Sequence, residues 1–103
     1  MANIFVKISE KLWLELNDMR IDFRMNWDQF IDYLCSTVKM PEKIQNDYVL
    51  HFGAEDMKLM NVKVSVATEK KFKKFAKRFK SFWHTLDYLA EFGQSRGIFD
   101  KLS

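Results

Sequence analysis

Two short stretches of this chain alternate apolar and polar residues, and a residue that can cap a helix follows each of them. Residues 3–9 are NIFVKIS and residues 61–67 are NVKVSVA. Such alternation is typical of a half-buried β-strand. Ser9 and Thr68 then offer side-chain oxygens to the first turn of a helix. The pattern therefore predicts the same strand-then-helix order twice in 103 residues.

The first of these units continues into two helices. Apolar residues recur at helical spacing behind Ser9, and Asn26 can cap a second helix. Pro41 ends the unit, because the residue before a proline is pushed out of the helical region. The helical positions expected to be buried are Leu12, Leu16, Met19, Phe30, Ile31, Leu34, Cys35 and Val38.

Helical spacing returns in the second half of the chain. It predicts a short helix over residues 42–52, which Gly53 would end. It then runs from Thr68 to about Phe92, and this stretch is compatible either with one unbroken helix or with two helices, the second beginning at Ser81. The residues that would pack inward from the short helix are Ile44, Tyr48 and Phe52.

The two halves correspond to each other along the sequence. A shift of 59 places residues 9–11 on residues 68–70, and a shift of 55 places the DYL at residues 32–34 on the DYL at residues 87–89. We interpret this as an internal duplication in which the second unit has a first helix four residues shorter. The expected division is a first repeat at 1–39, a linker at 40–60 that can hold the short helix, and a second repeat at 61–103.

One strand with two helices cannot be stable alone, because the strand stays unpaired and one helix face stays bare. We therefore predict a mainly α-helical fold in which the two strands pair as a short antiparallel β-ribbon and four helices cover its apolar face. Pairing within one chain and pairing between two chains both stay open. The strand residues expected to pack inward are Ile4, Val6, Ile8, Val62, Val64 and Val66. Those expected to face outward are Asn3, Phe5, Lys7, Asn61, Lys63 and Ser65.

The net charge of +3 is unevenly distributed. Residues 1–38 carry a net −2, residues 39–60 a net −1 and residues 61–103 a net +6. The excess lies in EKKFKKFAKRFK, residues 69–80, which has seven basic residues and one acidic residue. Such a run fits a solvated helix face, a polyanionic partner or an anionic membrane surface.

Several function classes find no support in the composition. No apolar run approaches the length of a membrane span and no signal-peptide pattern occurs, so we expect a soluble, cytoplasmic protein. A single cysteine fits a reducing compartment, and on an apolar helical face Cys35 should be an inert thiol. The two histidines show no metal-ligand spacing. We expect no enzyme, no metal, no cofactor and no small-molecule substrate.

The outward side chains of the ribbon point to a partner. Amide, ammonium and hydroxyl groups suit the edges of bases, and a two-stranded ribbon fits the major groove of B-DNA. Double-stranded DNA is therefore the predicted partner. Phe5 departs from this pattern, since its ring could contact a thymine methyl group or turn inward.

These features resemble the ribbon-helix-helix units of DNA-binding transcription regulators. IFVKIS matches the alternating strand of that family, SEKLWLEL its capped first helix and NWDQFIDYL the start of its second helix. Residues 61–92 match the pattern less fully, and Arg24 stands where the family usually has a glycine between its helices. The whole chain is similar to the tandem ribbon-helix-helix regulators of archaeal viruses, which implies the cytoplasm of a host cell and a role as repressor or activator.

The resemblance implies two sets of DNA-contacting residues. Three alternate positions of each strand contact bases, and the N-terminus of each second helix offers backbone N–H groups to a phosphate. Asp28 lies close to one of these sites, where its charge would repel a phosphate. The base-contacting set is Asn3, Phe5, Lys7, Asn61, Lys63 and Ser65. The phosphate-contacting set is Asn26, Trp27, Ser81 and Phe82, to which the basic run adds Lys73, Lys74, Arg78 and Lys80.

Two other functions stay open. An antitoxin-like protein would bind DNA with one half and a protein partner with the other. A basic amphipathic protein would bind an anionic membrane surface through the phenylalanines of residues 72–82, although this role needs neither the strands nor their duplication. A homodimer or a higher assembly on DNA is compatible with the leading prediction.

Overall fold

The strand–helix–helix order occurs twice along the chain. The computed structural model describes the backbone of residues 1–102 and the side chains of residues 1–93. Two strands form one antiparallel sheet, and about half of the chain is helical, so the fold is of the α+β type. In the described part, no helix has both the length and the apolar character needed to cross a membrane. The elements are β1 (Ala2–Ser9), α1 (Glu10–Asp22), α2 (Trp27–Thr37), β2 (Met57–Val64), α3 (Val66–Ala76) and α4 (Phe82–Leu102).

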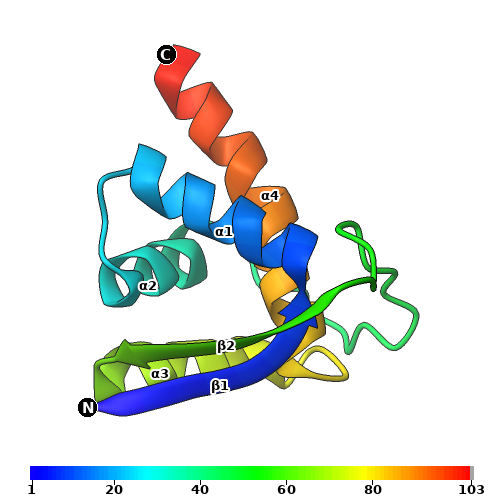
Figure 1. Cartoon of the computed structure of the whole chain (residues 1–103). Helices are drawn as coiled ribbons and strands as arrows, with labels where there is room; N and C mark the ends of the chain where they lie inside the picture. Colours follow the sequence, from blue (N-terminus) through cyan, green and yellow to red (C-terminus); the bar gives the residue numbers. More distant parts are fainter. Residues whose placement is uncertain (103) are drawn as a thin grey trace.

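The two strands of the ribbon pair within one chain over their whole length. Ala2 lies opposite Val64, Phe5 opposite Asn61, and Ser9 opposite the first residue of β2. The ribbon runs along the bottom of the molecule in Figure 1, and α1, α2 and α4 lie above it. One face of the ribbon packs into the core with all four helices. The buried residues on that face are Ile4, Ile8, Met60, Val62 and Val64.

The predicted start of the second strand, at residue 61, is wrong by four residues. β2 begins at Met57, and the chain leaves the ribbon at Ser65. The hydroxyl oxygen of Ser65 accepts the Thr68 N–H at 3.1 Å, so Ser65 is the helix cap and Thr68 is buried within the first turn of α3. Val66, predicted to pack inward, is 54% exposed, and Met60 is buried in the ribbon's inner face instead. Ser65 and Val66 extend the alternation of residues 61–64 in the sequence, but in the structure they are the cap and the first residue of α3.

The first pair of helices forms where the sequence predicts it. Ser9 Oγ accepts the Leu12 N–H at 3.2 Å and begins α1. Asn26 and Gln29 form a reciprocal capping box that begins α2. Between the two helices, Arg24 has φ of +56°, the left-handed conformation in which glycine is favoured. The buried positions of the two helices are Leu12, Leu16, Met19, Phe30, Ile31 and Leu34.

The second half has two helices, which resolves the alternative of one unbroken helix. α3 ends at Ala76, and α4 starts after Ser81, whose Oγ accepts the His84 N–H at 3.2 Å. The two caps of this half are 16 residues apart, Ser65 to Ser81, and those of the first half are 17 apart. The stretch from cap to cap is therefore shorter by one residue in the second unit, and α3, with 11 residues, is two residues shorter than α1, with 13, whereas the sequence comparison predicted a difference of four.

The predicted helix over residues 42–52 does not form. The chain between α2 and β2 is irregular, and Ile44 is exposed. Its backbone N–H groups bind a side chain instead: the buried carboxylate of Asp87 accepts the N–H of His51 at 2.9 Å and that of Phe52 at 3.1 Å. The Tyr48 hydroxyl donates to the same carboxylate at 2.6 Å. A long-range contact with α4 thus replaces the local hydrogen bonds of a helix.

Candidate nucleic-acid interface

The candidate site is built on the face of the ribbon that points away from the core. Five of the six residues predicted to contact bases lie there, but Ser65 does not, because it caps α3. The register adds two residues that the sequence did not single out, Met57 and Leu59. All of these side chains are exposed. The outer face, as we call it below, consists of Asn3, Phe5, Lys7, Met57, Leu59, Asn61 and Lys63.

The polar groups of the outer face are available to a partner. Within residues 1–93, the side chains of Asn3, Lys7, Asn61 and Lys63 form no hydrogen bond or ion pair. Neither strand contains an acidic residue, and together the strands contain three lysines. The third, Lys58, points the other way, and its ammonium group lies 4.2 Å from the centre of the Trp13 ring. The outer face is therefore positively charged and offers amide and ammonium donors.

The two ends of the outer face differ in chemistry. At one end Asn3 lies opposite Lys63, and at the other Lys7 lies opposite Leu59. Phe5 and Asn61 form the central pair. Phe5 is 59% exposed, so its ring points outward and not into the core. One end therefore carries only polar groups, whereas the other combines an ammonium group with apolar side chains.

The N-terminus of α2 is a second place where an anion could bind. The Asn26 N–H donates to Gln29 Oε1 at 3.0 Å, whereas the first two helical N–H groups, those of Trp27 and Asp28, have no acceptor within an α-helix. The Arg20 guanidinium lies over the Trp27 ring, 5.0 Å from its centre. Arg20 is a cation that sequence reasoning missed. Its only signal was its position in the last turn of the preceding helix.

Asp28 lies in this first turn but is already engaged. Its Oδ1 accepts the Ser65 N–H at 2.7 Å, and this hydrogen bond, together with one from Thr68, holds the pKa of the Asp28 carboxyl below its ordinary value of 3.8. The carboxylate thus joins the start of α2 to the cap of α3. It also keeps its negative charge, as the sequence analysis anticipated.

The N-terminus of α4 is arranged in a similar way. Ser81 Oγ lies 2.7 Å from His84 Nδ1 in addition to accepting the backbone N–H of His84. The Phe82 ring packs on Phe72 with 5.1 Å between ring centres, so only the Phe82 backbone could face an anion. Lys80, just before the cap, is exposed.

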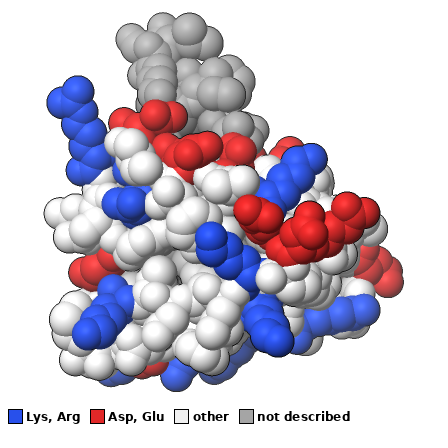
Figure 2. Space-filling view, in the orientation of Figure 1, with Lys and Arg blue, Asp and Glu red and all other residues white. Residues whose placement is uncertain are grey.

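The basic residues of α3, and Arg78 just after it, differ in whether their charged groups already have a partner. Lys73 Nζ lies 3.5 Å from Glu69, and Lys71 Nζ lies 2.6 Å from Asp32. Arg78 Nε donates to the Pro41 carbonyl at 3.1 Å, which ties this guanidinium to the irregular segment. Lys74 is exposed and forms no ion pair among the described residues. In Figure 2, Lys and Arg side chains are frequent along the side of the molecule where the ribbon and α3 lie.

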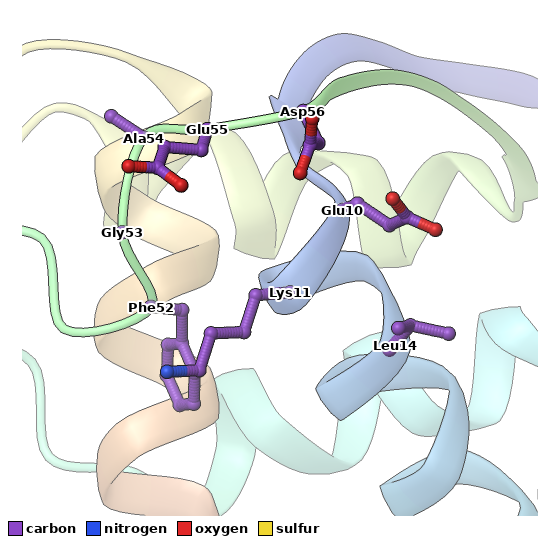
Figure 3. Close-up of a pocket in the computed structure, with 8 residues that line it drawn as sticks. All are labelled: Glu10, Lys11, Leu14, Phe52, Gly53, Ala54, Glu55 and Asp56. Carbon is purple, nitrogen blue, oxygen red and sulfur yellow. The ribbon is translucent and has the colours of Figure 1, made fainter.

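Acidic residues gather at the junction of α1 with the segment leading into β2. A shallow cavity of about 480 Å³ lies there, and Glu10, Glu55 and Asp56 are among the residues that line it (Figure 3). Among the described residues, no group of three histidine, cysteine or acidic side chains is placed to hold a metal ion. Burial raises the pKa of the Cys35 thiol to about 12, so this thiol stays protonated.

Comparison of the chain with protein-family models, with curated proteins and with solved structures finds no match. The geometry of the ribbon and of the helix N-termini is therefore the basis for assigning a function.

Proposed function

We propose that this protein is a sequence-specific regulator of transcription that binds double-stranded DNA, with two ribbon-helix-helix units in one chain. One observation carries the proposal: the ribbon is antiparallel, and its outer face presents unpaired Asn and Lys side chains with no acidic residue on either strand. A two-stranded ribbon has the width of the major groove. The groups on it are donors suited to guanine and adenine edges.

The internal correspondence of the two halves supports two units. Because Ser65, and not Thr68, caps α3, the shift of 59 inferred from the sequence for this cap is replaced by an offset of 56, which relates β1 to residues 58–65 and Ser9 to Ser65. The same offset relates Phe5 to Asn61, which also lie opposite each other in the ribbon. An approximate two-fold axis would therefore pass through the central pair of the outer face. Such an axis matches the local symmetry of duplex DNA, as in dimeric regulators.

Binding would place each group at a defined part of the duplex. The ribbon would lie in the major groove, with Lys7 and Lys63 at guanines and Asn61 near the centre of the site. The N–H groups at the starts of α2 and α4 would meet phosphates on the two sides, with Arg20 and Lys80 adding positive charge. Phosphate contacts would set the position of the protein, and base contacts would set its sequence preference.

The experiment is selection of bound sequences from a pool of random duplexes, followed by binding measurements with two variants. Lys63→Ala should reduce affinity for the selected site by about 5- to 150-fold, corresponding to a base contact of about 1–3 kcal/mol, and should relax the preference at one base position. Lys58→Ala is the matched control, because Lys58 lies on the same strand but on Trp13, away from the outer face. Equal losses for selected and random DNA in Lys63→Ala would assign Lys63 to phosphate. No loss at all, or no selected sequence, would contradict the proposal.

The packing of the second half bears on the membrane alternative. Phe72, Phe75 and Phe79, which a membrane-binding face would need, are buried in the core. Exposing them would require α3 to leave the ribbon. A liposome-binding assay with anionic vesicles, run beside the DNA measurement, distinguishes the two functions directly.

A further inference from the structure

The apolar side chains at one end of the outer face lie outside the buried core. Leu59 is 50% exposed and Met57 is 46% exposed, and the exposed ring of Phe5 belongs to the next outer-face pair beyond that of Leu59. They lie on the face of β2 opposite to the one that packs into the core. Large apolar side chains grouped in this way on a surface are typical of a contact site. Lys7, opposite Leu59, is the cation on the outer face at this end, and the acidic residues Glu10 and Asp56 begin only beyond the last pair of the ribbon.

The offset between the halves shows which residues of the outer face are equivalent. Lys7 corresponds to Lys63, so the same group occupies this position at both ends. Asn3, in contrast, corresponds to Leu59. Both ends of the ribbon would therefore present a lysine at equivalent positions. They would differ at the other position, where one end has the amide of Asn3 and the other has the isobutyl group of Leu59.

We propose that Leu59, flanked by Phe5 and Met57, contacts the C5-methyl group of a thymine in one half of the DNA site, where Asn3 contacts an adenine edge in the other half. The proposal rests on the DNA-binding function proposed above. The thymine methyl group is the apolar feature of the major groove, and aliphatic side chains recognise it by contact, whereas amides recognise adenine by paired hydrogen bonds. The bound site should have two half-sites that share the base beside the lysine and differ at the base beside Asn3 or Leu59.

The test uses the selected duplex and a derivative with deoxyuridine in place of each thymine in turn, which removes only the methyl group. At one position, this replacement should weaken binding of the unaltered protein about fourfold, the effect of taking one buried methyl group out of an apolar contact. Leu59→Ala should bind the thymine and deoxyuridine duplexes equally. Asn3→Ala is the matched control, because Asn3 is the equivalent residue in the other half. This variant should keep the full preference for thymine over deoxyuridine at the position that Leu59 contacts.

The outcomes separate this inference from the proposed function. If no sequence is selected, the DNA-binding function fails and the inference fails with it. If a sequence is selected but Leu59→Ala keeps the thymine preference, DNA binding stands and the role of Leu59 is refuted. A change in self-association on sedimentation, without a change in thymine preference, would instead assign Leu59 to a protein contact and also refute the inference. Unchanged thermal unfolding of Leu59→Ala would show that the exposed side chain is not needed for folding.

Discussion

The carboxylate of Asp87 is fully buried, and its hydrogen bonds among the described residues all come from the segment between α2 and β2. Removing it would leave the N–H groups of His51 and Phe52 without an acceptor. Asp32, which the DYL motif relates to Asp87, is by contrast half exposed and forms an ion pair with Lys71. The same residue type thus anchors a segment in one half and forms a surface ion pair in the other.

Asp87→Ala should lower the free energy of unfolding by about 3 kcal/mol, because one buried donor, the Phe52 N–H, and two partly buried donors lose the acceptor that a buried side chain provides. Asp32→Ala should change it by less than about 1 kcal/mol, since its ion pair is exposed to solvent. Urea denaturation of both variants measures the two values. Equal losses would mean that the segment before β2 does not depend on Asp87.

Asp28 predicts a dependence of stability on pH. Its pKa is below its ordinary value in the folded state, chiefly because of the Ser65 N–H, so the ionised form stabilises the fold at pH values above about 4. The contribution is lost as pH falls through the lowered pKa. Asp28→Asn should therefore be slightly less stable than the unaltered protein at pH 7, by under about 1 kcal/mol because the carboxylate is near solvent. The difference should shrink as the pH falls below about 4, and a difference that stays constant over the acid range would contradict this cause.

At the scale of elements, α3 combines two surfaces. Its inner side buries Phe72 and Phe75, and its outer side carries lysines, of which Lys74 is unpaired among the described residues and Lys73 is near Glu69. Neither lysine contributes to the core. We therefore expect this element to affect DNA affinity without affecting sequence preference.

Replacing both Lys73 and Lys74 by Ala should weaken binding to selected and random duplexes by similar factors. The slope of log affinity against log salt concentration should fall by roughly one unit per lost phosphate contact. Replacing both Lys39 and Lys43, which are exposed in the irregular segment, by Ala is a control with the same loss of two charges. A salt dependence equal to that of the unaltered protein would show that α3 faces away from the duplex.

How far the sequence predicts each element depends on how local its signals are. β1, α1 and α2 were predicted because alternation and the caps Ser9 and Asn26 lie within a few residues of each element. The start of β2 was missed because Leu59 faces solvent, so residues 57–60 do not alternate, and only pairing with β1 defines them as strand. The segment at 42–52 was predicted as helix because the acceptor for its N–H groups, Asp87, is 35 residues or more away in sequence.

The candidate site follows the same rule. Asn3, Phe5, Lys7, Asn61 and Lys63 were placed on the outer face by strand alternation alone. Met57, Leu59 and Arg20 were not singled out, because their positions depend on the register of the ribbon and on the way α1 packs against the start of α2.

At the scale of the whole molecule, both strands of the ribbon belong to one chain, and all four helices pack against it. A ribbon shared by two chains would dissociate on dilution, and its stability would depend on protein concentration. Here the midpoint of thermal unfolding should be the same over a 100-fold range of concentration, and sedimentation should give the mass of one chain, 12.4 kDa. A midpoint that rises with concentration would indicate strands exchanged between chains.

Pairing within one chain also changes what a single substitution does. In a ribbon assembled from two copies of the same chain, each replacement appears twice, once on either side of the axis, and must suit both places. Here Asn3 and Leu59 occupy equivalent places but are encoded separately, so either can change while the other is retained. One half of the outer face can thus be altered by a point mutation without altering its counterpart.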